Sequence, residues 1–476
     1  MNIIQKPKYR LVPAYSEIVF SVEDTVIIST KANVKYIAEV SISNQTITAN
    51  DLIGTFKVTP NNAGVGIFDF SKVVESYVSS DNLGGIVGSA NPNNASSFKG
   101  TLFTDQTPHS IHTIDKFATN KNSVRFLEIT FKIQYSDSVG STVSVDPTIS
   151  ATSDVFYIYN GTLQEEDIIA LDSSGNYGYN LDANNYIMND TDAKFLTNCP
   201  TTIDIGTNDY HTLAFFNNYD EDFVVGSTNA TDAKISAVVF RFFPELNAGG
   251  SQLNSKTILN NPTNGGKGTS HTNSDSNIIF LGCGPANIGT YHSLPSGTKS
   301  YSVQARDDNS TNISQRYVFN LIENDCKGFE KIRLTWLNRL GAWDYYSFTK
   351  RNVRTVETQR TSYKQISGTW NERKYKVHGF KGGQKTFRTR SKERLVLNSD
   401  FVTESECTWL EELFTSPEVY ILNELSTDGS EGYINKYVQP VTITSSTYTK
   451  QTRANDNLLQ YTIEIERSKN RVIQNA

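Results

Sequence analysis

The chain has 476 residues and a formal net charge of −6, with 37% hydrophobic, 20% charged and 11% aromatic residues. This length exceeds one ordinary hydrophobic core, which predicts two to four domains, and the aromatic content excludes a disordered chain. Thr, Val, Ile, Tyr and Phe recur between turn-forming Asn, Gly and Asp, a composition typical of strands and tight turns. We therefore expect a mainly β protein with two or three β-sandwich-like domains in tandem.

Residues 1–160 are predicted to form an N-terminal β-sandwich. Apolar residues alternate with polar ones, which is typical of antiparallel sheets with one buried face. A short helix is predicted at 71–78, with Ser71 as its N-cap, and an exposed loop at 79–100. Strands are predicted at 18–22, 36–42, 127–135 and 155–159.

Residues 161–325 are predicted to form a middle β domain. Residues 247–276 contain mostly Asn, Gly, Ser and Thr and almost no apolar residues. Loops of this length are usually functional or mobile, so we expect one long polar loop there. Apolar strands are predicted at 235–243, 278–281, 301–305 and 317–322.

Residues 326–476 are predicted to form a basic C-terminal β domain with one helix at 403–414. Thr403-Glu-Ser-Glu406 is a capping-box sequence, and the apolar residues that follow it form one stripe on the helix. Ser416-Pro417 end the helix. Strands are predicted at 332–337, 343–348, 419–422, 440–444 and 459–466.

The four cysteines, Cys199, Cys283, Cys326 and Cys407, are 84, 43 and 81 residues apart. Disulfide frameworks and zinc sites need closer, recurrent spacing, so we expect separate buried thiols and no dependence on an oxidising compartment. The polar segment 1–10 does not match a signal peptide. No stretch reaches the roughly 20 apolar residues of a membrane helix. We expect a soluble protein without a membrane segment.

One segment is strongly basic. From Lys331 to Arg394 there are 17 Lys/Arg and 4 Asp/Glu, a charge balance of +13. Because the whole chain has a net charge of −6, the residues outside this segment have a balance of −19. Cations alternate with Thr, Ser and aromatic residues in 374–378 and 385–390, which indicates strands with one charged face. The predicted interface residues are Arg373, Lys374, Lys376, Lys381, Lys385, Arg388, Arg390, Lys392 and Arg394.

Three roles fit this basic segment. It could bind an acidic protein surface or another copy of the chain, or it could consist of solvated strands without a specific role. Alternatively, it could bind nucleic acid, with Tyr363, Trp370, Tyr375 and Phe387 available for stacking. No nucleic-acid-binding motif is present, so we favour a protein interface and do not expect nucleic acid as a partner.

The segment Lys331 to Phe348 contains two of the four Trp residues and could form a ligand platform. The alternation of apolar residues in 332–337, followed by a turn at 338–341 and a return strand, favours instead a buried corner between two strands. The predicted motif and core residues are Trp336, Asn338, Arg339, Trp343, Asp344 and Trp409.

Candidate chemistry is sparse. His109 and His112 are three residues apart but have no third ligand at a suitable spacing, and Asp220-Glu-Asp222 does not have the interleaved spacing of a calcium loop. Gly282-Cys-Gly-Pro-Ala-Asn287 follows a strand, but Pro285 and the lack of a predicted helix argue for a turn rather than a dinucleotide loop. There is no GxSxG motif. We expect no catalytic residues, no metal and no cofactor.

Four segments carry a family resemblance. The core of the Trp segment, Leu334-Thr-Trp-Leu-Asn-Arg-Leu-Gly-Ala-Trp-Asp-Tyr-Tyr-Ser-Phe348, resembles virion structural proteins of tailed bacteriophages, especially marine and Bacteroidetes-type phages. Residues 280–288 and 400–419 resemble the same group, and 60–77, with Gly-Ile-Phe-Asp-Phe-Ser-Lys-Val-Val, is similar to segments of it. The resemblance implies a non-enzymatic tail, baseplate or neck component and transfers no catalytic residue.

The expected function is therefore that of a virion structural protein, assembled in the host cytoplasm as a ring or trimer with other virion proteins. One alternative is a host-receptor or glycan-binding tail fibre protein. A third hypothesis is a polysaccharide depolymerase on a β scaffold, because paired carboxylates can come from distant strands.

Overall fold

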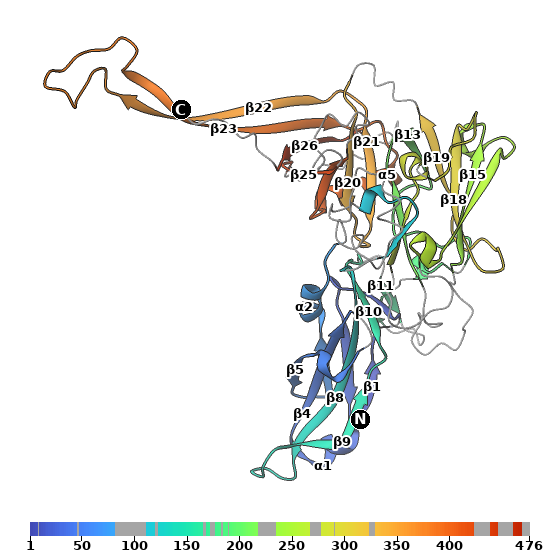
Figure 1. Cartoon of the computed structure of the whole chain (residues 1–476). Helices are drawn as coiled ribbons and strands as arrows, with labels where there is room; N and C mark the ends of the chain where they lie inside the picture. The colour runs from blue at the N-terminus through green and yellow to red at the C-terminus, as the bar shows by residue number, and fades with distance from the viewer. Residues whose placement is uncertain are drawn as a thin grey trace. The chain divides into compact units, whose positions relative to one another are not determined.

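The structure is a computed structural model, and its fold is mainly β, as the composition predicts. Several sheets and a few short helices build it, consistent with multiple β-sandwich-like domains (Figure 1). The residues that the structure describes are 1–7, 9–44, 47–80, 111–119, 122–164, 168–171, 177–181, 184–188, 190–217, 235–266, 278–289, 291–322, 329–422, 438–445 and 460–468.

Two sheets form the first sandwich. One has the strand order β1 (Asn2–Gln5), β3 (Val19–Glu23) and β6 (Val65–Asp69). The other has the order β2 (Leu11–Pro13), β10 (Phe156–Tyr159), β8 (Val124–Ser136), β4 (Ala32–Ser43) and β5 (Leu52–Val58), with β9 (Ser144–Thr152) paired to β8.

Aromatic rings join the two sheets. Phe20 of β3 lies 6.0 Å from Phe131 of β8 and 5.4 Å from Phe156 of β10, measured between ring centroids. Phe68 of β6 lies 5.6 Å from Phe131. These rings are at most 6% exposed, so the alternating apolar positions of the predicted strands form the core of this sandwich.

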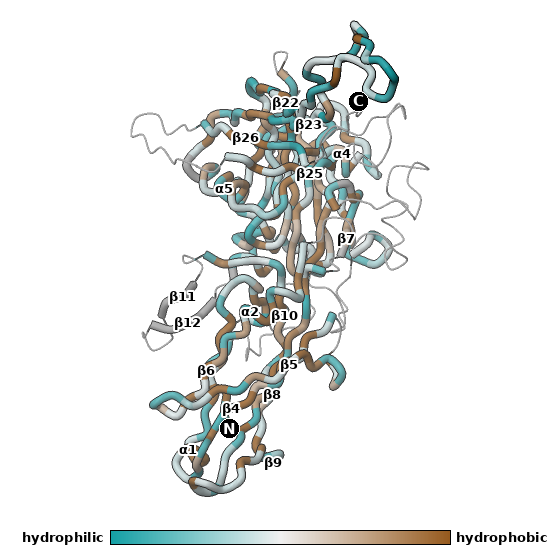
Figure 2. Tube along the Cα trace, turned by 90° about the vertical axis from the view of Figure 1, so that its left-hand side faces the viewer, coloured by the Kyte–Doolittle hydropathy of each residue, from teal (hydrophilic) through white to brown (hydrophobic). Residues whose placement is uncertain are grey.

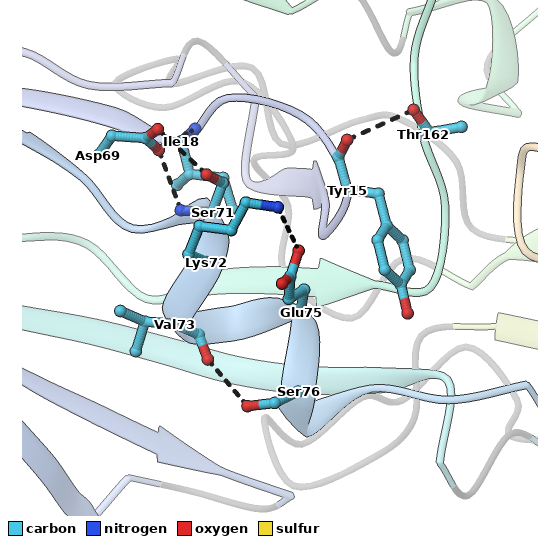
Figure 3. A network of polar contacts seen from close by, with 9 residues as sticks. All are labelled: Tyr15, Ile18, Asp69, Ser71, Lys72, Val73, Glu75, Ser76 and Thr162. Atoms are coloured by element: carbon cyan, nitrogen blue, oxygen red, sulfur yellow. Dashed lines mark hydrogen bonds and ion pairs between the residues drawn. The ribbon is translucent and has the colours of Figure 1, made fainter.

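The predicted helix 71–78 is shorter than expected. Helix α2 (Ser71–Val74) is followed by a 3-10 helix, Glu75–Tyr77, and the N-cap is Phe70 rather than Ser71. The carboxylate of Asp69 explains the shift, because it accepts hydrogen bonds from the backbone N–H groups of Ser71 and Ile18 (Figure 3). It therefore takes the place of a side-chain cap. Upstream, helix α1 (Thr25–Thr30) is capped by Asp24.

A second pair of sheets follows. One has the order β14 (Thr212–Phe216), β17 (Ile278–Gly282) and β7 (Phe117–Thr119). The other has the order β13 (Thr202–Gly206), β19 (Tyr317–Ile322), β18 (Ser300–Arg306), β15 (Ala237–Phe243) and β16 (Asn254–Leu259). A separate two-stranded sheet pairs β11 (Ile168–Leu171) with β12 (Tyr177–Leu181).

The prediction of one long polar loop at 247–276 is wrong over its described part. Strand β16 lies inside it and pairs antiparallel with β15, from Ala237 opposite Leu259 to Phe242 opposite Asn254. Because β16 is the edge strand of its sheet, only Ile258 is buried and the other side chains are polar or exposed. Backbone hydrogen bonds to β15 keep such a strand in the sheet. These bonds do not depend on side-chain type, so the sequence pattern does not reveal them.

The C-terminal sheet has seven strands. Their order is β21 (Trp343–Phe348), β20 (Ile332–Leu337), β24 (Val419–Leu422), β25 (Val438–Ile443), β26 (Thr462–Arg467), β23 (Gly383–Asn398) and β22 (Val353–Gln365). Helix α5 (Glu404–Thr415) has the predicted capping box between Thr403 and Glu406. Its Trp409 packs 5.3 Å from Trp336 of β20, ring centroid to ring centroid.

The structure divides the chain into two compact units. Unit 1 comprises Met1–Glu323 and Leu337–Asp344, and unit 2 comprises Asn324–Trp336 and Tyr345–Ala476. The predicted domain 1–160 and the predicted domain 161–325 up to Glu323 thus lie in one unit, within which β7 pairs with β17. The turn of the β20–β21 hairpin also belongs to unit 1, although it comes from the predicted third domain.

Candidate functional site

Strands β22 and β23 form a long two-stranded arm, residues 353–398, whose tip is 366–382 (Figure 1). They pair from Val353 opposite Val396 to Gln365 opposite Gly383. Strand β26 pairs only with 394–398 of β23, so within the described part of the chain the rest of the arm has no other partner strand. A two-stranded hairpin without a packing layer is marginally stable in water, so a surface of this kind calls for a functional explanation.

Both faces of the arm are open to solvent. Every residue of β22 from Val353 to Lys364 is exposed, and so are most residues of 383–390 in β23. Residues 385–390 do form a strand, as predicted. However, no other layer covers either face of this strand within the described residues, so the strand does not have one buried and one charged face. The predicted strand at 374–378 is wrong, because its only sheet contact is an isolated bridge between Val377 and Gly368.

The tip is an ordered loop that folds back on itself. The backbone N–H of Thr369 donates to the carbonyl of Lys376 at 3.1 Å, and that of His378 donates to Ser367 at 2.9 Å. Gly382 returns the chain to β23 at φ +97°, where a Cβ would lie 2.3 Å from the Ser367 Oγ. This conformation is open only to glycine, so the loop geometry depends on this residue.

Large apolar side chains point into solvent along the tip and the neighbouring strands. The exposed fraction is 82% for Trp370, whereas the other three Trp side chains of the protein are buried. Figure 2 shows short hydrophobic stretches in the tip among hydrophilic ones. A set of this kind is unusual on a surface and marks an interaction site. The exposed apolar residues of the arm are Val353, Val356, Tyr363, Ile366, Trp370, Tyr375, Val377, Phe380 and Phe387.

The predicted interface cations all lie on this arm. Arg388, Arg390, Lys392 and Arg394 occupy every second position of β23 and therefore share one face. Near the base of the arm, Lys392 pairs with Glu466 at 2.9 Å, and Arg394 lies within 3.4–3.7 Å of carboxylate oxygens of Glu357, Glu464 and Glu466. The pairs with Glu464 and Glu466 join the base of the arm to β26, and the pair with Glu357 joins β23 to β22.

Within the described residues, no ion pair joins the cations farther along the arm to β26. Among the residues that the structure describes, Arg388 and Arg390 make no ion pair, and both side chains are exposed. In the tip, Lys376 pairs with Glu372 at 3.5 Å, and Lys381 lies 5.9 Å from the Phe380 ring centroid. Exposed cations beside exposed apolar side chains fit a negatively charged partner with an apolar pocket.

A β-bulge adds an aromatic residue to the cationic face. Thr361 pairs with Arg388 and Ser362 pairs with Thr386, so Phe387 is the extra residue of β23. Its ring lies 6.4 Å from that of Tyr363, edge to face. The bulge therefore brings the exposed Phe387 ring, directly before Arg388 in the chain, close to the exposed Tyr363 ring.

Five of the six predicted motif residues are buried and Arg339 is half-buried, and the hairpin turn 338–341 forms a buried corner within unit 1 rather than a surface site. Trp336 is fully buried in unit 2 with Trp409. In unit 1, Trp343 packs against His112 at 4.8 Å between ring centroids, and the Arg339 carbonyl accepts a hydrogen bond from the Thr162 N–H. These contacts account for the two Trp residues of the motif without a ligand.

Asn338 and Asp344 complete this corner with buried hydrogen bonds. The Asn338 Oδ1 accepts from the N–H groups of Leu340 and Ala342 at 3.0 Å each. The Thr197 Oγ donates to the Asp344 carboxylate at 2.5 Å. Burial raises the pKa of nearby Tyr317 well above its usual value, and the charges of Cys199 and Asp344 raise it further. The phenol therefore stays neutral beside this carboxylate.

The segment 282–287 is not only a turn, because helix α4 (Pro285–Ile288) follows β17. It holds a buried junction that the sequence does not reveal. The Asn287 side chain accepts from the His211 N–H at 2.9 Å and donates to the carbonyls of His112 and Ile114. A Cβ on Gly284 would lie 2.4 Å from the His211 backbone nitrogen. These residues have a structural role.

Other candidate sites from the sequence have limited support. In the part of the chain with described coordinates, no group of three His, Cys, Asp or Glu could hold a metal ion. His109 and 220–222 lie outside that part. Cys199, Cys283 and Cys407 are buried free thiols, as predicted, and Cys326 lies outside the described residues. No helix among the described segments is long and apolar enough to cross a membrane.

Comparisons with known proteins find no match, either to a protein-family description or to a curated protein sequence. The functional argument therefore rests on the arm itself. A preformed loop with exposed aromatic side chains and unpaired cations can bind another macromolecule, and its contacts are those of a binding surface.

Proposed function

We propose that this protein is a non-enzymatic structural component of a tailed-phage virion, at the tail, baseplate or neck, and that it assembles with other virion proteins through the arm 353–398. The observation that carries the proposal is the arm, which exposes nine large apolar side chains. A chain that functions alone gains nothing from such a surface, whereas a subunit buries it on assembly.

Two further features support an assembly role. The Trp segment resembles virion proteins of tailed phages in sequence, and in the structure its residues serve packing rather than ligand binding. The arm and the rest of the chain also differ in sign of charge. Residues 353–398 contain twelve Lys/Arg and three Asp/Glu, a charge balance of +9. Because the whole chain has a net charge of −6, the residues outside the arm have a balance of −15.

The test is to locate the protein in particles. Antibodies against the purified full chain would be applied to phage particles from the source culture and imaged by immunogold electron microscopy. We expect gold at one fixed position on the tail, baseplate or neck, and the intact chain among the particle proteins. Its absence from purified particles, with the protein present in the infected cell, would contradict the proposal.

A second candidate function is host-receptor or glycan binding by a tail fibre protein. The exposed rings of Trp370 and Tyr375, at 82% and 60% exposure, favour it, because aromatic faces can stack on sugar rings. A glycan array probed with the full chain tests it. Binding that is lost in Trp370→Ala would support this function over assembly, and no binding at any glycan would remove it.

A further inference from the structure

The tip of the arm needs a partner that covers apolar side chains. Ile366, Trp370, Tyr375, Val377 and Phe380 are 56–82% exposed, and all five lie within 15 residues. Two of them are β-branched aliphatic residues, which offer no flat face to a base or a sugar but pack well in a protein pocket. The chemistry of the tip therefore favours a protein partner.

Another arm cannot be that partner. Two arms side by side would each bring a charge balance of +9, and like charges in contact oppose association. Strand β22, the edge of its sheet, also carries Arg354, Glu357, Arg360 and Lys364. Charged side chains on an edge strand discourage pairing with a second strand. The partner surface must instead be acidic.

The rest of the same chain meets this requirement, because it carries −15. We propose that the tip is an apolar anchor that is buried by a second copy of this protein, while Arg388 and Arg390 face acidic residues of that copy outside the arm. This inference rests on the proposed assembly function and deepens it. Because the arm of one copy binds a surface outside the arm on the next, repeated contacts yield an open filament or a closed ring, whose smallest case is a two-fold dimer with reciprocal arms.

The two parts of the arm have separate roles in this contact. The backbone hydrogen bonds of 367–378 hold the tip loop in one conformation before binding, which lowers the entropy lost on association. The apolar contacts of the tip then mainly slow dissociation. The exposed cations act over a longer distance, and they set the rate of encounter and its dependence on salt.

The first experiment measures self-association of the full chain by analytical ultracentrifugation over a range of concentrations. The test variant is Trp370→Ser with Phe380→Ser. The matched control is Phe401→Ser, which removes a ring that is 61% exposed and lies outside the arm. We expect the apparent Kd of self-association to rise about tenfold or more in the test variant and to stay unchanged in the control.

The second experiment identifies the surface that the tip contacts. A photo-reactive phenylalanine analogue at position 370 would be irradiated in the assembled protein, and mass spectrometry would locate the cross-links. We expect cross-links to acidic segments outside the arm 353–398 in another copy. Cross-links mainly between two tips would overturn this contact, even if the protein assembles.

The possible results separate this inference from the proposed function. Self-association that is equal in wild type and in the tip variant would overturn the tip as anchor. A wild-type chain that stays monomeric at all concentrations, yet is present in particles, would overturn the second copy as partner and leave the virion role standing. Tip-dependent binding of labelled single-stranded DNA, without self-association, would assign the arm to nucleic acid instead.

Discussion

Asn338, in the turn between β20 and β21, donates a 2.8 Å hydrogen bond through Nδ2 to the carbonyl of Leu196, 142 residues earlier in the chain. Its Oδ1 accepts from the N–H groups of Leu340 and Ala342. One amide side chain thus orders its own turn and joins it to a distant segment of unit 1. Because Asn338 is 4% exposed, water cannot replace these bonds.

The first prediction concerns this side chain. Asn338→Ala leaves the N–H groups of Leu340 and Ala342 and the carbonyl of Leu196 without their partner. Each unsatisfied group costs about 1–3 kcal/mol. We therefore expect a lower unfolding temperature and faster hydrogen exchange at Leu340 and Ala342. Asn338→Asp retains the acceptor for both amides but cannot donate to Leu196, and we expect a smaller acceleration there. Equal exchange in wild type and Asn338→Ala would contradict the role of this residue.

The second prediction concerns the glycines of the tip. Gly382→Ala adds a Cβ at φ +97° and 2.3 Å from the Ser367 Oγ, whereas at Gly383 the φ is +73° but no atom lies within 4 Å. Backbone strain of this kind costs about 1–3 kcal/mol. We expect Gly382→Ala to accelerate hydrogen exchange at His378 and to weaken self-association more than any other glycine variant of the tip. Gly383→Ala should have effects between those of Gly382→Ala and the wild type.

Gly379→Ala is the matched control, since no atom lies within 4 Å of its added Cβ and its φ is not in the left-handed range. Exchange and self-association should stay close to wild type. If Gly379→Ala and Gly382→Ala behave alike, the loop conformation does not matter for association.

The third prediction concerns the unpaired cations. Arg388→Glu with Arg390→Glu changes the charge by −4 without breaking an ion pair among the described residues. We expect wild-type self-association to weaken between about 50 mM and 500 mM salt, because salt screens exposed charges. The variant should associate weakly already at low salt and depend little on salt.

Lys35→Glu with Lys57→Glu provides the control, because it makes the same change in net charge at exposed positions outside the arm. Sedimentation velocity should show normal association for this pair. Equal loss in both double variants would indicate that net charge, not the arm, controls assembly.

The fourth prediction concerns Asp146, which lies in β9. Hydrogen bonds from Thr148 and from the Tyr135 hydroxyl, at 2.7 Å, lower its pKa from 3.8 to about 2. Since the folded-state pKa lies below the usual value, the carboxylate favours the folded state at pH above about 4. This contribution is lost as the pH falls towards about 2.

NMR titration of the Asp146 carboxyl carbon measures this shift. Thr148→Val should raise the pKa towards 3.8, because it removes the hydroxyl donor with the largest effect. Thr130→Val, on the same sheet but without contact to Asp146, should leave the titration unchanged. A midpoint near 4 in the wild type would show that these hydrogen bonds do not form in solution.

Local sequence patterns predicted most of the elements. The alternation in 127–135 corresponds to β8, and the capping box at Thr403 corresponds to the start of α5. The turn at 338–341 between two strands is also present. These features succeed because the residues that determine them are neighbours in sequence, either on one strand face or within one helical turn.

Other elements could not be predicted because distant residues decide them. Strand β16 has one buried apolar residue and exists through backbone pairing with β15. Strand β7, three residues long, pairs with β17 more than 150 residues away. The side chain of Asn287 gives no hint that it will bond to carbonyls of His112 and Ile114.

The sequence by itself determined that this protein is mainly β, that strands such as β8 have alternating apolar residues, and that its cations gather in one segment. It also predicted Trp336, Trp343 and Trp409 as core residues, but it could not determine that Trp370 lies at the tip of a free arm. A strand that packs on a core and a strand in a free arm share the same period of two. Only the tertiary structure decided between them. Strand β26 pairs with residues 394–398 of β23, and the rest of the arm extends beyond this pairing. The apolar side chains of the arm are therefore left for a partner to cover.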